Sequence, residues 1–170
     1  MRNAQHAEPP GIAEYRQVMG LFATGVCVVS VPEGPHGLTA MTVNSLVSVS
    51  LDPMLLCWSL QNSSGRYAAF AEADRFAISI LALEQAELAR RYAAHGDSLL
   101  RLEDFASSPG GLPIVVGSMG HIECRRWSDY PAGDHTMILG EVTGLGALAS
   151  MGEAGNPLGF FNGQFCSIAG

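Results

Sequence analysis

The segment from Leu38 to Leu51 places apolar residues at alternate positions with small polar residues between them. A period of two is typical of β-strands, in which neighbouring side chains point to opposite faces. The apolar face carries Met41, Val43, Val47, Val49 and Leu51, and the polar face carries Thr42, Asn44, Ser48 and Ser50. Asp52-Pro53 ends the pattern because proline has no N–H to donate to a ladder. The segment therefore predicts one or two strands with a polar face of small side chains.

Most of the other elements that we predict are also strands. Strands are expected over 26–31, 54–60, 75–81, 114–127 and 135–148, with a hairpin turn at Asn162-Gly163 and a loop over 128–134. Helical spacing covers 13–22, with Gly25 as its C-terminal cap, and shorter helices are expected over 66–73 and 84–94. Because strands mostly follow strands, the order predicts a mainly β antiparallel barrel or sandwich with two or three short helices.

Composition restricts the class of protein further. With 170 residues, 48% hydrophobic and 15% charged, we expect a flexible arm over 1–11 and one domain over 12–170. The net charge of −7 argues against general binding of nucleic acid, which needs a basic surface. No signal peptide is visible, and the longest apolar stretch, 21–31, is too short to cross a membrane. The four separated cysteines predict reduced, buried thiols, so we expect a cytoplasmic protein without membrane contact.

Several short motifs carry little weight. The segment Gly144–Ala149 matches a GxGxxA pattern, but only 21 residues follow it and no βαβ unit surrounds it. A nicotinamide nucleotide is therefore not expected to bind on a Rossmann unit. His121 with Glu123 lacks a third metal ligand, so no metal is expected.

Three segments have residues suited to a ligand. The polar face of 39–53 suits a flat ring that forms hydrogen bonds, although it also fits the solvated face of an amphipathic strand. His135, in Gly133–Gly140, can bind a ligand or pair with a buried carbonyl. The hydroxyls, turn N–H groups and guanidinium of Asn62–Arg66 can hold phosphate, or can serve as a helix cap and a surface arginine.

Taken in order, these segments resemble the flavin reductase family with the FMN-binding split-barrel fold, the short reductase components of two-component flavin-dependent monooxygenases. The resemblance runs from about Tyr15 to Phe165. Its pieces are the opening helix and glycine of 15–26, the flavin-binding stretches 37–45 and 48–53, Gly133-Asp134-His135 with Leu139–Val142, and the closing strands of 157–165. Tyr130–His135 also resembles reductases of aromatic polyketide pathways.

This resemblance implies a Greek-key split β-barrel and an NAD(P)H:flavin oxidoreductase. Such an enzyme passes a hydride from NADH or NADPH to N5 of FMN or FAD. It forms a homodimer with flavin near the dimer interface, and its reduced flavin reaches a partner flavin-dependent monooxygenase by diffusion.

The resemblance also implies the site residues. The flavin ring is expected against Met41, Thr42, Val43, Asn44 and Ser45, with Ser50, Leu51 and Asp52 close by. The phosphate end is expected at Asn62, Ser63, Ser64 and Arg66. His135 is the catalytic candidate where nicotinamide approaches, bordered by Phe160 or Phe161. Leu46 stands where the family usually has Phe, and Phe160-Phe161-Asn162 replaces a common Tyr-plus-basic pattern.

Two other functions fit the same residues. An FMN-holding protein on the same barrel can act as an electron carrier or as an enzyme like pyridoxamine-phosphate oxidase. A barrel without enzymatic activity can act as a ligand sensor or assembly module. The sequence leaves open the choice between FMN and FAD, the choice between NADH and NADPH, and the identity of the partner oxygenase.

Overall fold

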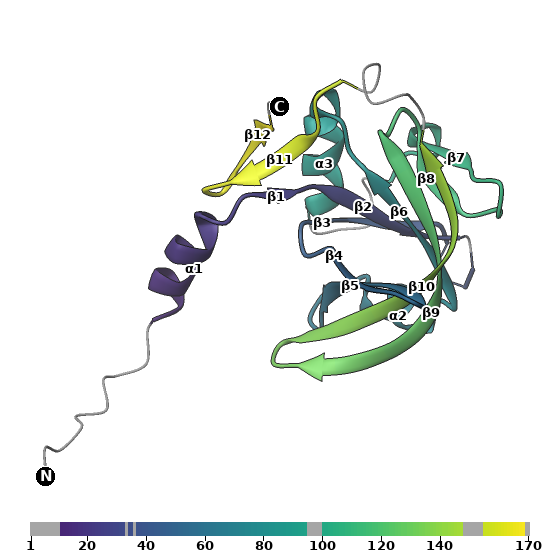
Figure 1. Ribbon diagram of the computed structural model, residues 1–170, viewed down its shortest axis with the longest axis horizontal. Helices are drawn as coiled ribbons and strands as arrows, with labels where there is room; N and C mark the ends of the chain where they lie inside the picture. Colours follow the sequence, from purple (N-terminus) through teal and green to yellow (C-terminus); the bar gives the residue numbers. More distant parts are fainter. Residues whose placement is uncertain (1–10, 33, 36, 95–99, 148–154, 169–170) are drawn as a thin grey trace, which may run out of the picture.

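A computed structural model describes residues 11–32, 34–35, 37–94, 100–147 and 155–168, and it is mainly β (Figure 1). The strands are β1 (Thr24–Gly25), β2 (Cys27–Val31), β3 (Thr39–Val43), β4 (Val47–Leu51), β5 (Met54–Gln61), β6 (Arg75–Ile80), β7 (Phe105–Ser107), β8 (Pro113–Val115), β9 (Gly120–Ala132), β10 (His135–Ala147), β11 (Leu158–Phe161) and β12 (Gln164–Ser167). The helices are α1 (Ile12–Gly20), α2 (Tyr67–Glu72) and α3 (Ala86–Ala93), with 3-10 turns η1 (Leu83–Gln85) and η3 (Leu102–Asp104).

Seven strands form one antiparallel sheet in the order β3-β2-β6-β9-β10-β5-β4. Its two edge strands, β3 and β4, are consecutive in the chain and are joined only by the link 44–46. A link of three residues spans at most about 10–14 Å, so the sheet must curl until its edges approach one another. Within the described residues no ladder pairs β3 with β4, so the curled sheet stays split along this seam. The mainly β split-barrel prediction is confirmed.

Large aromatic side chains fill the inside of the curled sheet. Trp58 of β5 lies edge-on to Phe70 at 5.4 Å and to Phe76 at 6.0 Å between ring centroids. Phe70 comes from α2, so its burial fixes this helix against the sheet. Such edge-on aromatic pairs stabilise the fold by more than the burial of their surface area alone would. This cluster sets the position of the loop that joins β5 to α2.

A second layer packs on the outer side of β2 and β3. Helix α3 buries Ala89 and Tyr92 there, beside Leu158 of β11. The hydroxyl of Thr42 donates a hydrogen bond to the carbonyl oxygen of Ala89 at 2.8 Å. This bond ties α3 to the end of β3.

The hairpin of β9 and β10 is longer than the sequence predicted. The segment 128–132, expected as a loop, continues β9, and the turn is only Gly133 and Asp134, with Gly133 at φ +64. The expected strand 114–127 is broken where the chain turns at Gly117, at φ +73. Both faces near the hairpin tip are exposed, so no apolar alternation marks the strand there.

Other predictions of local structure had mixed outcomes. The first helix is confirmed, but Leu21 caps it and Gly25 lies in β1. The Asn162-Gly163 turn is confirmed, with positive φ at both residues, as a type I′ turn requires. Except for Gly11, the arm expected over 1–11 lies outside the described residues.

All four cysteines are free, and only Cys166 is half-exposed. Burial raises the pKa of Cys27 and of Cys124 to about 12. The predicted burial is found for Cys27, Cys57 and Cys124, which belong to the packed interior, but not for Cys166. In the described part of the chain, no helix combines the length and apolar character needed to cross a membrane.

Gly140 tests how tightly β10 packs on the core. A Cβ added at Gly140 would lie 2.5 Å from Cζ of Phe76 and 3.0 Å from Cβ of Cys124. We expect Gly140→Ala to lower the free energy of unfolding by about 1–3 kcal/mol, because a buried ring must shift. Gly25→Ala is the control, since nothing lies within 4 Å of its added Cβ, and a change within about 0.5 kcal/mol is expected. Equal effects in urea denaturation would contradict this description of the core.

Candidate functional site

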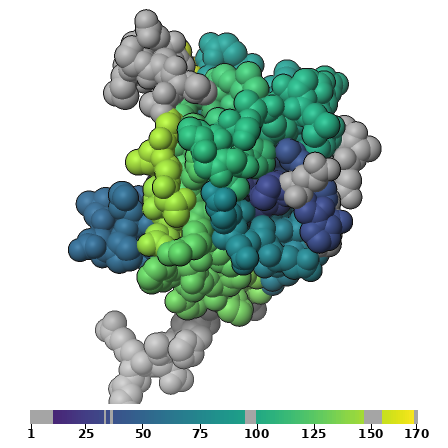
Figure 2. All heavy atoms as spheres, turned by 90° about the vertical axis from the view of Figure 1, so that its right-hand side faces the viewer, coloured from purple at the N-terminus to yellow at the C-terminus, as the bar shows by residue number. Residues whose placement is uncertain are grey.

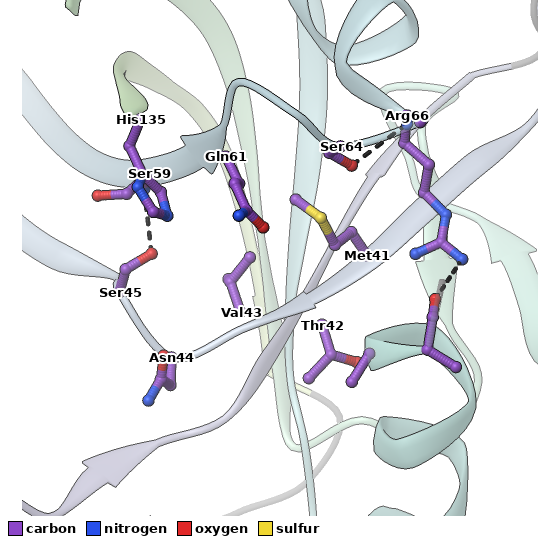
Figure 3. A pocket seen from close by; sticks show the side chains of 13 residues that line it. Met41, Thr42, Val43, Asn44, Ser45, Ser59, Gln61, Ser64, Arg66 and His135 are labelled. Carbon is purple, nitrogen blue, oxygen red and sulfur yellow. Dashed lines mark hydrogen bonds between the residues drawn. The ribbon is translucent and has the colours of Figure 1, made fainter. Parts of the chain in front are cut away.

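A cavity of about 400 Å³ lies at the seam of the sheet, where β3 ends and the chain crosses toward β4 (Figure 3). Its lining comes from β3, β5, the start of β10, the loop before α2 and the end of α3. The lining residues are Met41, Thr42, Val43, Asn44, Ser45, Ser59, Gln61, Ser64, Gly65, Arg66, Ala93, Ala94 and His135.

The end of β3 forms one wall of the cavity. Val43 is buried in the core, whereas Thr42 reaches the other way to α3. Beyond the strand, the Ser45 hydroxyl accepts a hydrogen bond from the backbone N–H of Ser59 at 3.0 Å. This bond joins the link between the two edge strands to β5. The wall is therefore stiff and carries small side chains, which lets a flat ligand approach the backbone.

Arg66 lies at one end of the cavity, opposite His135 (Figure 3). Its guanidinium donates to the carbonyl oxygens of Tyr92 at 3.0 Å and of Ala94 at 2.9 Å. Both carbonyls lie at the C-terminal end of α3, where the helix dipole favours a cation. The Ser64 hydroxyl accepts the Arg66 backbone N–H at 3.2 Å. Arg66 is thus held with its charge beside the cavity.

His135 occupies the other end, as the first residue of β10. Its Nδ1 lies 2.7 Å from Oδ1 of Asp134. A carboxylate only accepts hydrogen bonds, so Nδ1 donates and Nε2 is left as the second polar atom of the ring. The hydrogen bond from His135, together with its charge, holds the pKa of Asp134 below its usual value.

The hairpin tip that carries His135 is anchored to the loop after β5. The backbone N–H of Asn62 donates to the carbonyl oxygen of Asp134 at 2.9 Å. The Thr136 hydroxyl donates to Oδ1 of Asn62 at 2.8 Å and lies 3.0 Å from the Tyr67 hydroxyl. Two segments far apart in the sequence, 61–67 and 134–136, are therefore locked together at the cavity.

The structure brings eight of the predicted site residues to this cavity. They are Met41, Thr42, Val43, Asn44, Ser45, Ser64, Arg66 and His135. Asn62 does not line the cavity but accepts a hydrogen bond from Thr136 at the hairpin tip. Ser63 is exposed to solvent and does not line the cavity either. Ser50, Leu51 and Asp52 lie at the outer end of β4 and do not line it. Phe160 lines an adjacent cavity, and the side chain of Phe161 is 44% exposed.

Five of the lining residues were not predicted from the sequence. Ser59 and Gln61 are two apart on β5 and share the face opposite Trp58, so their polar spacing was a usable signal. Gly65 lay inside a segment already singled out. Ala93 and Ala94 reach the cavity only because α3 docks on β3, which no local pattern reveals. Among the described residues, no group of three or more His, Cys, Asp or Glu is placed to hold a metal ion.

A model of the flavin reductase like domain matches residues 19–169, which is most of the chain. The chain belongs to the flavin reductase-like family. The resemblance to this family drawn from the sequence motifs is thereby confirmed.

Relatives of this flavin reductase-like chain cover most of its length. It is 42% identical over 166 residues to the FMN reductase (NADH) SmoA of Agrobacterium fabrum, covering 95% of this chain and 90% of that one. It is 31% identical over 156 residues to HsaB, the reductase subunit of a flavin-dependent monooxygenase of Rhodococcus jostii, covering 91% and 76%. The solved NADH:FAD oxidoreductase SgcE6 of Streptomyces globisporus, in complex with NAD and FAD fragments, superposes with a TM-score of 0.84 at 32% identity, covering 98% of each chain.

Proposed function

We propose that this protein is an NAD(P)H:flavin oxidoreductase that uses NADH or NADPH to reduce FMN or FAD. One observation carries the proposal. The cavity at the seam of the split barrel has the hydrogen-bonded guanidinium of Arg66 at one end and the imidazole of His135, oriented by Asp134, at the other. The NADH-dependent reductases SmoA and SgcE6 support it, because both align along nearly the whole chain.

The lining fits a flavin. The wall of Met41–Ser45 offers a stiff strand end with small side chains for the flat ring. Ser64 and the charge of Arg66 suit the phosphate end, which needs a cation and hydrogen-bond donors. With flavin and nicotinamide bound, the two cofactors supply the hydride chemistry themselves. The protein then has to hold the two rings in contact and to present backbone donors to the ring edge.

His135 orients the nicotinamide or its carboxamide in this proposal. Asp134 holds Nδ1, so the imidazole keeps one orientation and Nε2 serves the substrate. Hydride transfer between the cofactors does not require a protein base, so His135 acts as an orienting group. The Asn62 and Thr136 bonds keep the imidazole in register with the wall of β3.

We propose further that two copies of the chain form a homodimer. Helix α1 buries no residue and projects from the sheet (Figure 1). The helix and the two residues after it carry five apolar or aromatic residues that are 61–75% exposed: Ile12, Tyr15, Val18, Leu21 and Phe22. The β4–β5 hairpin, the blue segment that projects in Figure 2, exposes Val47, Val49, Leu51 and Met54. Exposed apolar helix faces and edge strands favour association unless they are covered.

A second copy of the chain supplies a suitable cover. An apolar helix face and an apolar edge on each copy allow a closed, two-fold symmetric interface. In such a dimer the end of β4, with Ser50, Leu51 and Asp52, lies between the copies. These three residues then approach the partner's flavin cavity, which accounts for their absence from the lining of the cavity in their own chain.

Reduced flavin then passes by diffusion to a flavin-dependent monooxygenase. HsaB, named as the reductase subunit of such an enzyme, supports this role. We place the protein in the cytoplasm, with residues 12–170 acting as one catalytic domain.

The first test measures oxidation of NADH and of NADPH at 340 nm by gel-filtered protein, with FMN, with FAD and without flavin. We expect turnover only when free flavin is added, because flavin is then a substrate that leaves after reduction. Yellow protein that keeps its flavin through gel filtration and turns over without additions contradicts diffusible flavin and favours a carrier. Absence of turnover with every pair contradicts the reductase.

His135→Ala tests the orienting imidazole. We expect kcat/KM for NADH to fall about tenfold, the effect of one lost hydrogen bond of about 1–1.5 kcal/mol. The melting temperature and the affinity for FMN should stay at their wild-type values, since the ring is half-exposed and anchors only Asp134. Unchanged steady-state kinetics would remove His135 from the site.

Leu51→Arg tests the proposed interface. Leu51 is 85% exposed in the single chain, so a charge at this position should destabilise the dimer without destabilising the fold of the monomer. Light scattering after gel filtration should show a dimer for the wild type and a monomer for the variant. Leu102→Arg is the matched control, because Leu102 is 69% exposed on η3, which belongs neither to α1 nor to the β4–β5 hairpin, and the variant should remain dimeric. A monomeric wild type, or a dimeric Leu51→Arg, would contradict the interface.

A further inference from the structure

Two more cavities lie next to the flavin cavity, and each shares lining residues with the one before it. The first, about 150 Å³, shares Thr42, Val43, Asn44 and Ala93 with the flavin cavity and adds Phe160 and Phe165. The second, about 410 Å³, shares both phenylalanines with the first and adds Arg90 and Gln164. We call the two together the outer lobe. Its lining residues come mainly from α3 and from the β11–β12 hairpin.

The wall of the outer lobe is a built arrangement of aromatic and cationic groups. Phe160 and Phe165 pack edge-on, with ring centroids 5.5 Å apart. The guanidinium of Arg90 lies over the Phe165 ring, 5.3 Å from its centroid. Arg90 also pairs with Glu87, one turn earlier on α3. The aromatic ring and the carboxylate together limit where this cation can move, while half of its side chain stays accessible, at 53% exposure.

Charge indicates what the outer lobe can hold. The chain carries a net charge of −7, which disfavours anions over most of its surface. Among the described residues that line the three cavities, the arginines are Arg66 and Arg90. Arg66 lies at the phosphate end of the flavin cavity. Arg90 is thus the cation available to a second anionic group bound next to the flavin.

A dinucleotide has such a group. NADH and FAD each carry an adenosine monophosphate half, the adenylate half, beyond the mononucleotide half that reacts, and this adenylate half must extend out of the flavin cavity when the reactive ring is inside. We infer that the outer lobe binds the adenylate half of NADH or of FAD, with Arg90 contacting its phosphate. This inference rests on the proposed function and extends it to a specificity-determining residue. Glu87 weakens the contact because it partly neutralises Arg90.

Arg90→Ala tests the lobe with substrates that possess or lack the adenylate half. With FMN as acceptor, we expect the KM for NADH to rise about tenfold, the loss of one charge-assisted contact, while the KM for reduced nicotinamide mononucleotide and kcat stay unchanged. With reduced nicotinamide mononucleotide as donor, a rise in the KM for FAD but not for FMN assigns the lobe to FAD instead. Glu87→Gln should lower the same KM that Arg90→Ala raises.

Arg125→Ala is the matched control. Arg125 is also an exposed arginine paired with a carboxylate, Glu141 at 2.6 Å, but it lies on β9 outside the three cavities. Equal effects of Arg125→Ala and Arg90→Ala would reduce the result to net charge and overturn the inference. Equal changes for NADH and reduced nicotinamide mononucleotide, with FMN and FAD also affected alike, would overturn it as well.

A calorimetric titration with adenosine monophosphate separates this inference from the reductase activity. It requires no turnover, so it remains decisive if the wild type oxidises neither NADH nor NADPH. We expect the wild type to bind adenosine monophosphate about tenfold more tightly than Arg90→Ala does. Equal affinity of the two proteins, or no binding to either, would overturn the outer lobe as an adenylate site.

Discussion

The short link between the edge strands β3 and β4 is the constraint on which the rest of the structure depends. Three residues, 44–46, must carry the chain from one edge of a seven-stranded sheet to the other. The sheet can meet this requirement only by curling, and the curl encloses the cluster of Trp58, Phe70 and Phe76. The bond from Ser59 to Ser45 joins the link to β5 without closing the ladder. The seam therefore stays open, and the site lies there.

The polar groups at the seam are held from several directions. Arg66 is fixed by the end of α3, and α3 is fixed in turn by Thr42. His135 is fixed by its neighbour Asp134 and by the loop after β5. Each group is tied to the backbone of another element, so the cavity keeps its shape through tertiary contacts. Such preorganisation suits a reaction in which the bound cofactors carry the chemistry and the protein supplies geometry.

The sequence predicted those parts of the fold and site that have a local signal. Alternation marked β3 and β4, and Asn162-Gly163 marked the last hairpin. The last residues of β9, 128–132, were missed because neither of their faces is buried, which leaves no apolar period to read. Ala93 lines the cavity and Arg90 the outer lobe only through the docking of α3 on β3, a long-range contact without a pattern of its own. The resemblance to the family supplied the candidate site residues that local patterns left undecided.

A crystal structure of the protein soaked with FMN tests the central claim most directly, that the seam of the barrel is the flavin site. The predicted result is a flavin ring against Met41–Ser45, with its phosphate beside Ser64 and Arg66 and its exposed face toward His135. Flavin bound elsewhere on the barrel, or its phosphate at the His135 end, would contradict the claim.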